Sequence, residues 1–193
     1  MPMTNLMVNQ PRFENFEDYL AYKEGDDGWY ELFNGELMAV PPESGENVCI
    51  ATKLLICFAQ LVGYQRVRGH GLELEVRGEP RNRYPDLTII RQEHIEQLRS
   101  RNTLRLGMAP PDLVIEVVSP GDLQRERDYV AKRFQYADRG IPEYWIIDPQ
   151  AQQILVLMLQ PGGYQETLYR GDDRLQSQLL ALSLTGREVL SVL

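Results

Sequence analysis

Residues 112–119 read DLVIEVVS and form the most apolar strand-like run in the chain. The run lies between Pro-Pro at positions 110–111 and Pro-Gly at positions 120–121. A short, nearly continuous apolar run between such turn residues predicts a central strand that is buried on both faces. Glu116 interrupts the run, and a buried carboxylate is costly unless it is paired, hydrogen-bonded or bound to a metal. The run therefore predicts a central strand with one position that needs a partner.

The segments on either side of this run alternate between helical and strand-like patterns. These patterns predict helices over residues 16–24, 46–62, 92–99 and 122–139, strands over 65–77, 84–91 and 143–148, and hairpins over 29–40 and 153–169. In the helix over residues 122–139, Val130, Phe134 and Ala137 form the expected apolar face. This order of elements predicts an α+β fold class, with a mixed β-sheet flanked by helices.

The length and composition fit one globular domain. The chain has 193 residues, of which 43% are hydrophobic and 25% are charged, so it can bury a core of its own. We expect a single domain over residues 1–193, with about the first 13 residues flexible. No stretch approaches the roughly 18 apolar residues of a membrane span, and no signal-peptide pattern opens the chain, so no membrane partner is expected.

The two cysteines indicate a reducing compartment. Cys49 and Cys57 lie eight positions apart in one predicted helix, which separates them by roughly 12 Å along the axis. That separation is too large for a disulfide, so both are expected to pack as small apolar residues. The sequence therefore predicts a cytoplasmic protein.

The formal net charge of −8 counts against a surface that grips a polyanion over a wide area. The basic residues are, however, concentrated locally. One group surrounds the strand over residues 84–91 and the other lies on the helix over residues 122–139: Arg77, Arg81, Arg83 and Arg91, and then Arg125, Arg127, Lys132 and Arg133. A local basic lip of these residues around an acidic metal site is compatible with the acidic net charge, although it is not by itself evidence for nucleic-acid binding.

Asp86 and Glu116 are the candidate metal ligands. Asp86 follows Pro85 at the start of an apolar strand, and Glu116 lies in the middle of the central strand. Two carboxylates on neighbouring strands make an oxygen-rich site suited to Mg²⁺ or Mn²⁺. The alternative is that each carboxylate pairs with a buried arginine or caps a strand end.

Lys132 is the third candidate. It lies near the middle of the helix that follows the central strand, from which it can reach the strand ends. A lysine in that place can orient or activate an attacking water and stabilise the charge that develops on a phosphate. The alternative is a solvated lysine that pairs with Asp128 one turn earlier.

Four motifs, in this order, resemble those of a known family. They are YELFNGEL at residues 30–37, PDL at 85–87, PDLVIEVVSP at 111–120 and DYVAKRFQYADRGIPEYWIIDP at 128–149. From about residue 14 to about residue 169 the chain resembles the bacterial putative restriction-endonuclease family of the PD-(D/E)XK nuclease superfamily. The most specific part is EVVSP followed by K-x-x-x-Y and GIPEYWIIDP. The resemblance implies a restriction-endonuclease-like core and a divalent-metal phosphodiesterase site.

The resemblance also assigns roles to residues. Asp86 matches the metal-binding aspartate, and Glu116 matches the acid of the (D/E)XK element. The lysine expected two positions later is Val118 here, and Lys132 on the following helix matches the lysine instead. Glu31 matches an early acidic residue that can complete the metal shell, with an ordinary hairpin carboxylate as the alternative.

Other polar residues are expected to be structural or exposed. Relatives often carry a histidine near Asn47, and this chain has none there. His70 and His94 are expected at the surface. Asp128 and Glu143 are expected to be structural partners, with Asp128 orienting the helix that follows the central strand.

These residues together predict an endonuclease that depends on Mg²⁺ (or Mn²⁺) and hydrolyses DNA phosphodiester bonds. The alternative belongs to another functional class: a non-catalytic or regulatory module that keeps the nuclease fold for binding or assembly. The two hypotheses differ in whether Asp86, Glu116 and Lys132 converge on one point. The sequence does not separate an RNA- or nucleotide-directed phosphodiesterase from the first hypothesis.

A homodimer is the expected assembly. This expectation follows from the resemblance, from the aromatic-rich strand over residues 143–148 and from the apolar C-terminal hairpin. Within that strand, Tyr144 and Trp145 are expected to pack in a core or an interface rather than to stack on bases. The sequence contains no separate DNA-reading motif, so recognition is expected from loops, an oligomer or a partner.

Overall fold

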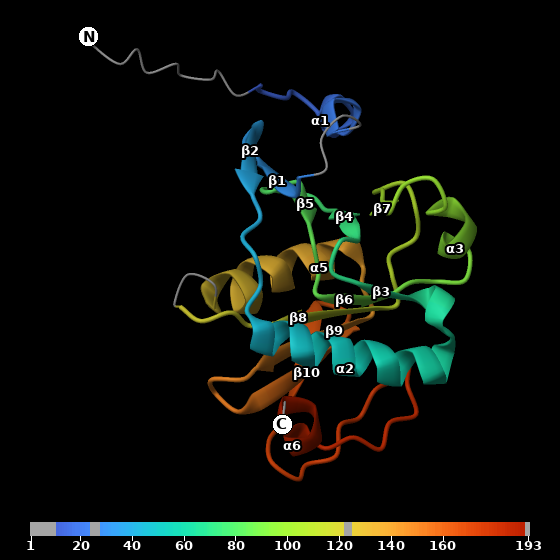
Figure 1. The fold of residues 1–193 in the computed structure, drawn as a ribbon, viewed down its shortest axis with the longest axis vertical. Coiled ribbons are helices and arrows are strands. Elements are labelled where there is room, and N and C mark those ends of the chain that lie inside the picture. The colour runs from blue at the N-terminus through green and yellow to red at the C-terminus, as the bar shows by residue number, and fades with distance from the viewer. Residues whose placement is uncertain (1–10, 24–27, 122–124, 192–193) are drawn as a thin grey trace.

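The computed structural model describes residues 11–23, 28–121 and 125–191. Within these residues a six-stranded mixed sheet lies between helices, which confirms the predicted α+β fold class (Figure 1). Most of the N-terminal segment for which flexibility is predicted lies outside the described residues.

The main sheet is built around β8. Its strands are β3 (Val67–Gly69), β6 (Leu87–Ile89), β8 (Leu113–Val117), β9 (Glu143–Asp148), β10 (Gln153–Gln160) and β11 (Gly163–Tyr169). They lie in the order β11-β10-β9-β8-β6-β3; β8 is parallel to β9, and the other neighbours are antiparallel. The run that predicts a central strand thus forms β8, between β6 and β9.

Alternate residues of β8 contact two different cores. The core under α2 (Gly45–Val62) contains every second residue of the strand: Leu113, Ile115 and Val117. The core on the opposite face contains Val114 and Val118. Because side chains alternate along a strand, Glu116 belongs to that second face. A carboxylate therefore lies beneath the helix that follows β8 in the chain.

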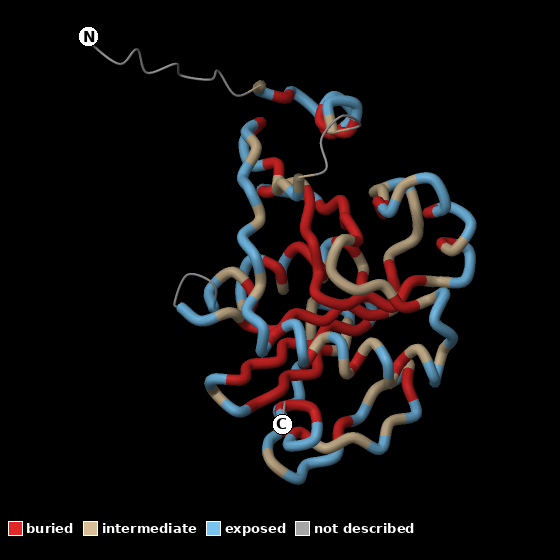
Figure 2. Tube along the Cα trace, in the orientation of Figure 1, coloured by how far each residue is buried: buried red, intermediate tan, exposed pale blue. Residues whose placement is uncertain are grey.

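Helix α2 covers the first face of the sheet, which confirms the predicted helix over residues 46–62. Its N-cap Ser44 accepts a hydrogen bond from the backbone N–H of Asn47 (3.1 Å). The side chains of Ile50, Leu54 and Phe58 are completely buried against the sheet. Figure 2 shows the buried strands of the sheet in red, with the outer turns of the helices exposed.

By length and composition alone, α2 could also cross a membrane, since its 18 residues have a mean hydropathy of 1.4. This differs from the expectation that no stretch is long and apolar enough. The core helix of a folded domain passes the same test, and one face of α2 packs on the sheet here.

The helix predicted over residues 122–139 buries the opposite face from the one expected. Its described part contains the π-helical turn η2 (Arg127–Lys132) and then α5 (Arg133–Arg139). Val130 is 62% exposed and Phe134 is 76% exposed, so the predicted apolar face points to solvent. The buried face is mostly polar: Asp128, Lys132, Gln135, Tyr136 and Arg139. The helix covers the face of β8 that carries a carboxylate, and a polar helix face supplies the hydrogen-bonding groups that such a carboxylate needs.

The strand predicted over residues 65–77 is divided in the structure. It forms the turn η1 (Tyr64–Arg66), then β3, then β4 (Glu73–Glu75). The division falls at Gly71, whose φ of 112° is a left-handed conformation that breaks a strand. Strand β4 then pairs in a separate small sheet of order β5-β4-β7, which includes β5 (Asn82–Arg83) and β7 (Thr103–Leu104).

Two further predicted elements are shorter than expected. The strand over residues 84–91 keeps only β6. The helix over residues 92–99 is reduced to α3 (His94–Gln97).

His94, expected at the surface, is fully buried, and its Nδ1 accepts a hydrogen bond from the Arg91 backbone N–H (3.2 Å). Burial lowers the pKa of this histidine, so it packs as a neutral side chain.

Both predicted hairpins are present. After α1 (Phe16–Lys23), β1 (Tyr30–Phe33) pairs with β2 (Glu36–Ala39). Asn34 and Gly35, with φ of 50° and 80°, form the two-residue turn between them. The second hairpin is β10 and β11, and the described chain ends near α6 (Gly186–Leu190), which contacts α2.

The packing of α2 predicts very different costs for two substitutions that lie two residues apart, on different faces of the helix. We expect Leu54→Ala to lower the free energy of unfolding by about 2–5 kcal/mol, because it opens a cavity in the core under the sheet. Ile56 is 56% exposed, so Ile56→Ala is expected to change that free energy by about 0.5 kcal/mol or less. Urea unfolding of both variants measures the difference. Equal effects would contradict the placement of α2.

Candidate functional site

Side chains from separate elements line one small cavity. Asp86 comes from the segment just before β6, Glu116 from β8, Lys132 from η2 and Glu31 from β1. The cavity has a volume of about 10 Å³, which is about the room that one water molecule needs. The residues predicted to converge are therefore neighbours in space, although they are far apart in the sequence.

Strand pairing brings Asp86 next to Glu116. Leu87 of β6 is opposite Ile115 of β8, so the next pair in this antiparallel register is Asp86 with Glu116. The Val117 backbone N–H donates to Asp86 Oδ2 (2.6 Å), which fixes the aspartate against the end of β8. Both carboxylates are buried.

Lys132 connects the helix to this pair. Its Nζ lies 2.7 Å from Glu116 Oε2 and 2.8 Å from Asp128 Oδ1. The Tyr136 hydroxyl donates to the other oxygen, Glu116 Oε1 (2.5 Å). Lys132 therefore reaches the strand carboxylate and also pairs with Asp128, but it is buried and not the solvated lysine of the alternative hypothesis. Asp128 holds Lys132 in place and its backbone carbonyl accepts a hydrogen bond from Tyr144 (2.9 Å).

Burial and charge oppose each other at Glu116. Burial raises its pKa from 4.5 to about 7, with Lys132 opposing the rise and the charges of Asp86 and Asp128 adding to it. Burial alone would lower the pKa of Lys132, but the two carboxylates it contacts outweigh this effect and raise that pKa. Lys132 is therefore a charged donor at neutral pH, while Glu116 can exchange its proton near pH 7.

Glu31 lines the same cavity but already has a cationic partner. Arg83 Nη1 donates to Glu31 Oε1 and Oε2, at 3.1 Å each. The Arg83 side chain is buried, and its Nε donates to Gln135 Oε1 (2.8 Å). Glu31 is therefore close enough to join a metal shell, and its negative charge is compensated by Arg83 in the structure.

The arginines do not form the expected basic lip. Of the eight basic residues in the two predicted groups, only Arg127 and Lys132 line the cavity in the described structure. Most of the others pair with carboxylates elsewhere: Arg77 with Asp138, Arg91 with Asp112, Arg125 with Asp148, and Arg133 with Glu166. Because these guanidinium groups are already in ion pairs, the rim of the site is less basic than the sequence suggests.

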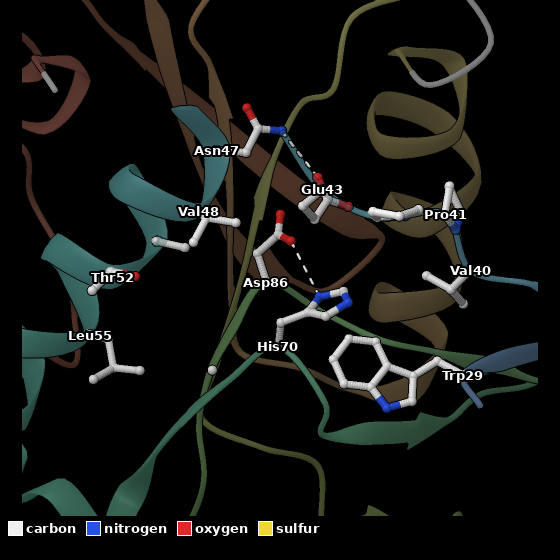
Figure 3. Close-up of a pocket in the computed structure, with 13 residues that line it drawn as sticks. Trp29, Val40, Pro41, Glu43, Asn47, Val48, Thr52, Leu55, His70 and Asp86 are labelled. Atoms are coloured by element: carbon white, nitrogen blue, oxygen red, sulfur yellow. Dashed lines mark hydrogen bonds and ion pairs between the residues drawn. The ribbon is translucent and has the colours of Figure 1, made fainter. Parts of the chain in front are cut away.

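His70 belongs to the site, which the sequence reading missed. It was expected at the surface, yet its Nδ1 lies 3.6 Å from Asp86 Oδ1 (Figure 3). That nitrogen is buried and has no hydrogen-bond partner. The imidazole packs on the indole of Trp29, with ring centroids 4.4 Å apart. The only signal in the sequence was Gly69 and Gly71 on either side, which allow the chain to turn there.

Asn47 is the second residue that the sequence did not assign. Its Nδ2 donates to the Val117 carbonyl (3.1 Å), to Ser119 Oγ (3.1 Å) and to Glu43 Oε2 (3.3 Å). These bonds attach the first turn of α2 to the end of β8, beside the two carboxylates. Asn47 is therefore part of the framework of the site.

The donor atoms at the site fit a hard divalent cation. Among the residues that the structure describes, no group of three or more His, Cys, Asp or Glu side chains could hold an ion alone. Mg²⁺, however, is usually held by one or two carboxylates and keeps several waters. Among the residues that the structure describes, none donates a hydrogen bond to Asp86 Oδ1, and His70 Nδ1, 3.6 Å away, has no hydrogen-bond partner, so this oxygen is available to an ion. Asp86 and Glu116 would hold the ion, with the Val117 carbonyl as the nearby backbone oxygen.

The residues of β9 have structural roles, as expected. Glu143 accepts hydrogen bonds from Trp145 Nε1 (2.6 Å) and Ser177 Oγ (3.0 Å). Tyr144 and Trp145 are fully buried, so they pack in the core and do not stack on bases. Because β9 lies between β8 and β10, neither of its edges is free, and all six of its residues are buried within the described chain. The dimer stays a prediction that light scattering can measure.

Comparison with known proteins supports the family resemblance. No curated protein matches this chain. Among solved structures, the chain is similar to the crystal structure of a putative nuclease belonging to DUF820 from Anabaena variabilis, with a TM-score of 0.64 and 18% identity, covering 86% of this chain and 92% of that one. That likeness shows the fold alone. The model of the Uma2 family, described as putative restriction endonuclease, matches residues 16–191, and the chain therefore belongs to this family.

Proposed function

We propose that the protein is a Mg²⁺- or Mn²⁺-dependent endonuclease that hydrolyses DNA phosphodiester bonds. The observation that carries the proposal is the convergence of Asp86, Glu116 and Lys132 on one cavity. A buried lysine held between two carboxylates is a poor way to stabilise a core, because apolar residues of similar size do this at least as well. The presence of these buried charges is better explained by chemistry at the site.

Each side chain has a distinct role in the proposed reaction. Asp86 and Glu116 would hold the cation, and Glu31, which lines the same cavity, would contribute only if its pairing with Arg83 were broken. A bound Mg²⁺ polarises the phosphate and lowers the pKa of a water that it binds. Lys132 is charged, so it donates hydrogen bonds rather than accepting a proton. It therefore orients the attacking water and stabilises the charge that develops on the phosphate.

The alternative is a non-catalytic module that keeps the nuclease fold. Two observations favour it: both oxygens of Glu116 already have donors, Lys132 and Tyr136, and the cavity holds about one water. In that case the polar cluster only joins the helix to the sheet. Activity of the purified protein separates the two candidates.

The proposed roles predict how site variants behave in a nicking assay. With supercoiled plasmid and Mg²⁺ or Mn²⁺, the wild type is expected to nick DNA, and Asp86→Asn and Glu116→Gln to show no nicking above background. Lys132→Met is expected to be slower by roughly 100-fold or more, because it removes a donor to the developing charge. The assay measures initial rates for each protein, with EDTA as the metal-free reaction.

Asp138→Asn is the matched control, since Asp138 pairs with exposed Arg77 away from the cavity (3.2 Å). Its rate should equal that of the wild type. Nicking that survives in both Asp86→Asn and Glu116→Gln would assign the activity to a contaminant and refute the proposed site. A wild type without any metal-dependent cleavage would favour the non-catalytic module.

The raised pKa of Glu116 predicts a pH effect on stability in metal-free buffer. Between pH 4.5 and about 7 the unfolded carboxyl loses its proton while the native one keeps it. The native state then binds more protons, so this group lowers the free energy of unfolding as pH rises through that window. Over this window the free energy of unfolding falls by about 3 kcal/mol. Above about pH 7 it no longer changes through this group. Glu116→Gln lacks this contribution.

Urea unfolding of the wild type and Glu116→Gln across this pH range measures the difference. We expect the wild type to lose stability relative to the variant as pH rises, and the difference to become constant above about pH 7. If the free energy of unfolding of the two proteins changes with pH in parallel, the native pKa of Glu116 is close to its ordinary value.

A further inference from the structure

A large apolar cleft opens directly beside the small polar cavity. Its volume is about 570 Å³, which is in the usual range for small-molecule sites. Five residues line both the cleft and the cavity: Val40, Pro41, Glu43, His70 and Asp86. The cleft is therefore continuous with the proposed reaction site, and Asp86 faces both (Figure 3).

One wall of the cleft is aromatic. It carries Trp29, which is 41% exposed, whereas most large apolar residues that the structure describes are buried. Two other rings fix the indole in place. It stacks on Tyr84, with ring centroids 5.9 Å apart, and packs on His70, with ring centroids 4.4 Å apart. A rigid and partly exposed tryptophan is a surface on which another ring can stack.

The opposite wall is the exposed side of α2. Val48, Ala51, Thr52 and Leu55 line the cleft there, and Val48 is 50% exposed. In Figure 3 Val48, Thr52 and Leu55 lie across the cleft from Trp29 and Val40, with His70 and Asp86 between the two walls. A planar group that enters the cleft would therefore contact a ring on one side and aliphatic carbons on the other.

The charges of the cleft select against a phosphate backbone within it. Among the described residues that line it, none is a lysine or arginine, and Glu43 and Asp86 are acidic. Affinity for DNA that rests on phosphate contacts needs such cations. Apolar and aromatic walls instead suit a nucleobase, because every base has a π-face that can stack on an aromatic side chain. The two cations of the site, Arg127 and Lys132, line the adjoining cavity, and a phosphate would lie at the edge of that cavity, because the cavity itself has room for about one water.

We propose that this cleft binds an unpaired nucleobase next to the phosphate that is cut, so that the substrate class is single-stranded DNA. The inference rests on the proposed nuclease function and specifies its substrate. A base in a duplex could enter only after flipping out of the stack, which costs unstacking and unpairing energy. A single strand avoids that cost, and stacking supplies the affinity that a protein of net charge −8 does not gain from phosphates.

The test is binding of a short fluorescein-labelled single strand, measured by anisotropy in EDTA so that no cleavage occurs. Thr52→Phe places a ring in the cleft from an exposed position of α2, and it should weaken binding about tenfold or more. Gln60→Phe is the matched control, because Gln60 is exposed on the same helix and does not line the cleft. It should bind as the wild type does.

Two further variants test the aromatic wall. Trp29→Ala should weaken binding about as much as Thr52→Phe does, and Trp29→Phe should restore most of the affinity, because it keeps a ring for stacking. The same sequence in a fully paired duplex should bind about tenfold more weakly than the single strand. A loss in Trp29→Ala that Trp29→Phe does not restore would overturn the stacking role.

The outcomes for the cleft and for the nuclease are distinguishable. If metal-dependent cleavage is present but Thr52→Phe and Gln60→Phe bind alike, the cleft is not the base site and the nuclease proposal stands. Equal binding of single strand and duplex also overturns the inference. If no cleavage occurs but Thr52→Phe alone loses single-strand binding, the base site is supported and the enzymatic proposal is the one that fails.

Discussion

The contact between Lys132 and Glu116, with 2.7 Å between Nζ and Oε2, is the constraint on which the rest of this structure depends. Glu116 lies in the strand at the centre of the sheet, where an uncompensated charge would destabilise the fold by several kcal/mol. The strand supplies no partner of its own, since its neighbours Ile115 and Val117 are apolar. The compensating cation has to come from another element, so the helix after β8 must lie across the sheet with its charged side inward.

The same constraint organises the surrounding side chains. Asp128 holds the lysine from one turn earlier, at 2.8 Å, and Tyr136 occupies the other oxygen of the strand carboxylate. The π-helical turn that ends at Lys132 is a feature that often accompanies functional sites. Packing and proposed chemistry thus use the same groups. The cleft beside these charged groups is lined mostly by apolar residues. We therefore place the phosphate next to the charged groups and the base in the cleft.

Much of the fold was predictable because a few segments carry strong local patterns. The β8 run, the stripe of α2 and the Asn34-Gly35 turn each specify their element without outside help. The helix over residues 122–139 misled the prediction, since Val130 and Phe134 resemble a core face but are exposed. Its orientation is set by a charge on another strand. His70 and Asn47 were missed for a related reason: only the folded chain shows that they lie beside Asp86 and Val117.

The most direct test of the account is anomalous diffraction from crystals soaked in Mn²⁺, which locates the ion without any assay of activity. We predict one site at which oxygens of Asp86 and Glu116 share the ion at about 2.0–2.6 Å, with Lys132 still beside them. Manganese bound only at exposed carboxylates, with the Lys132–Glu116 contact unchanged and the cavity empty, would contradict the account.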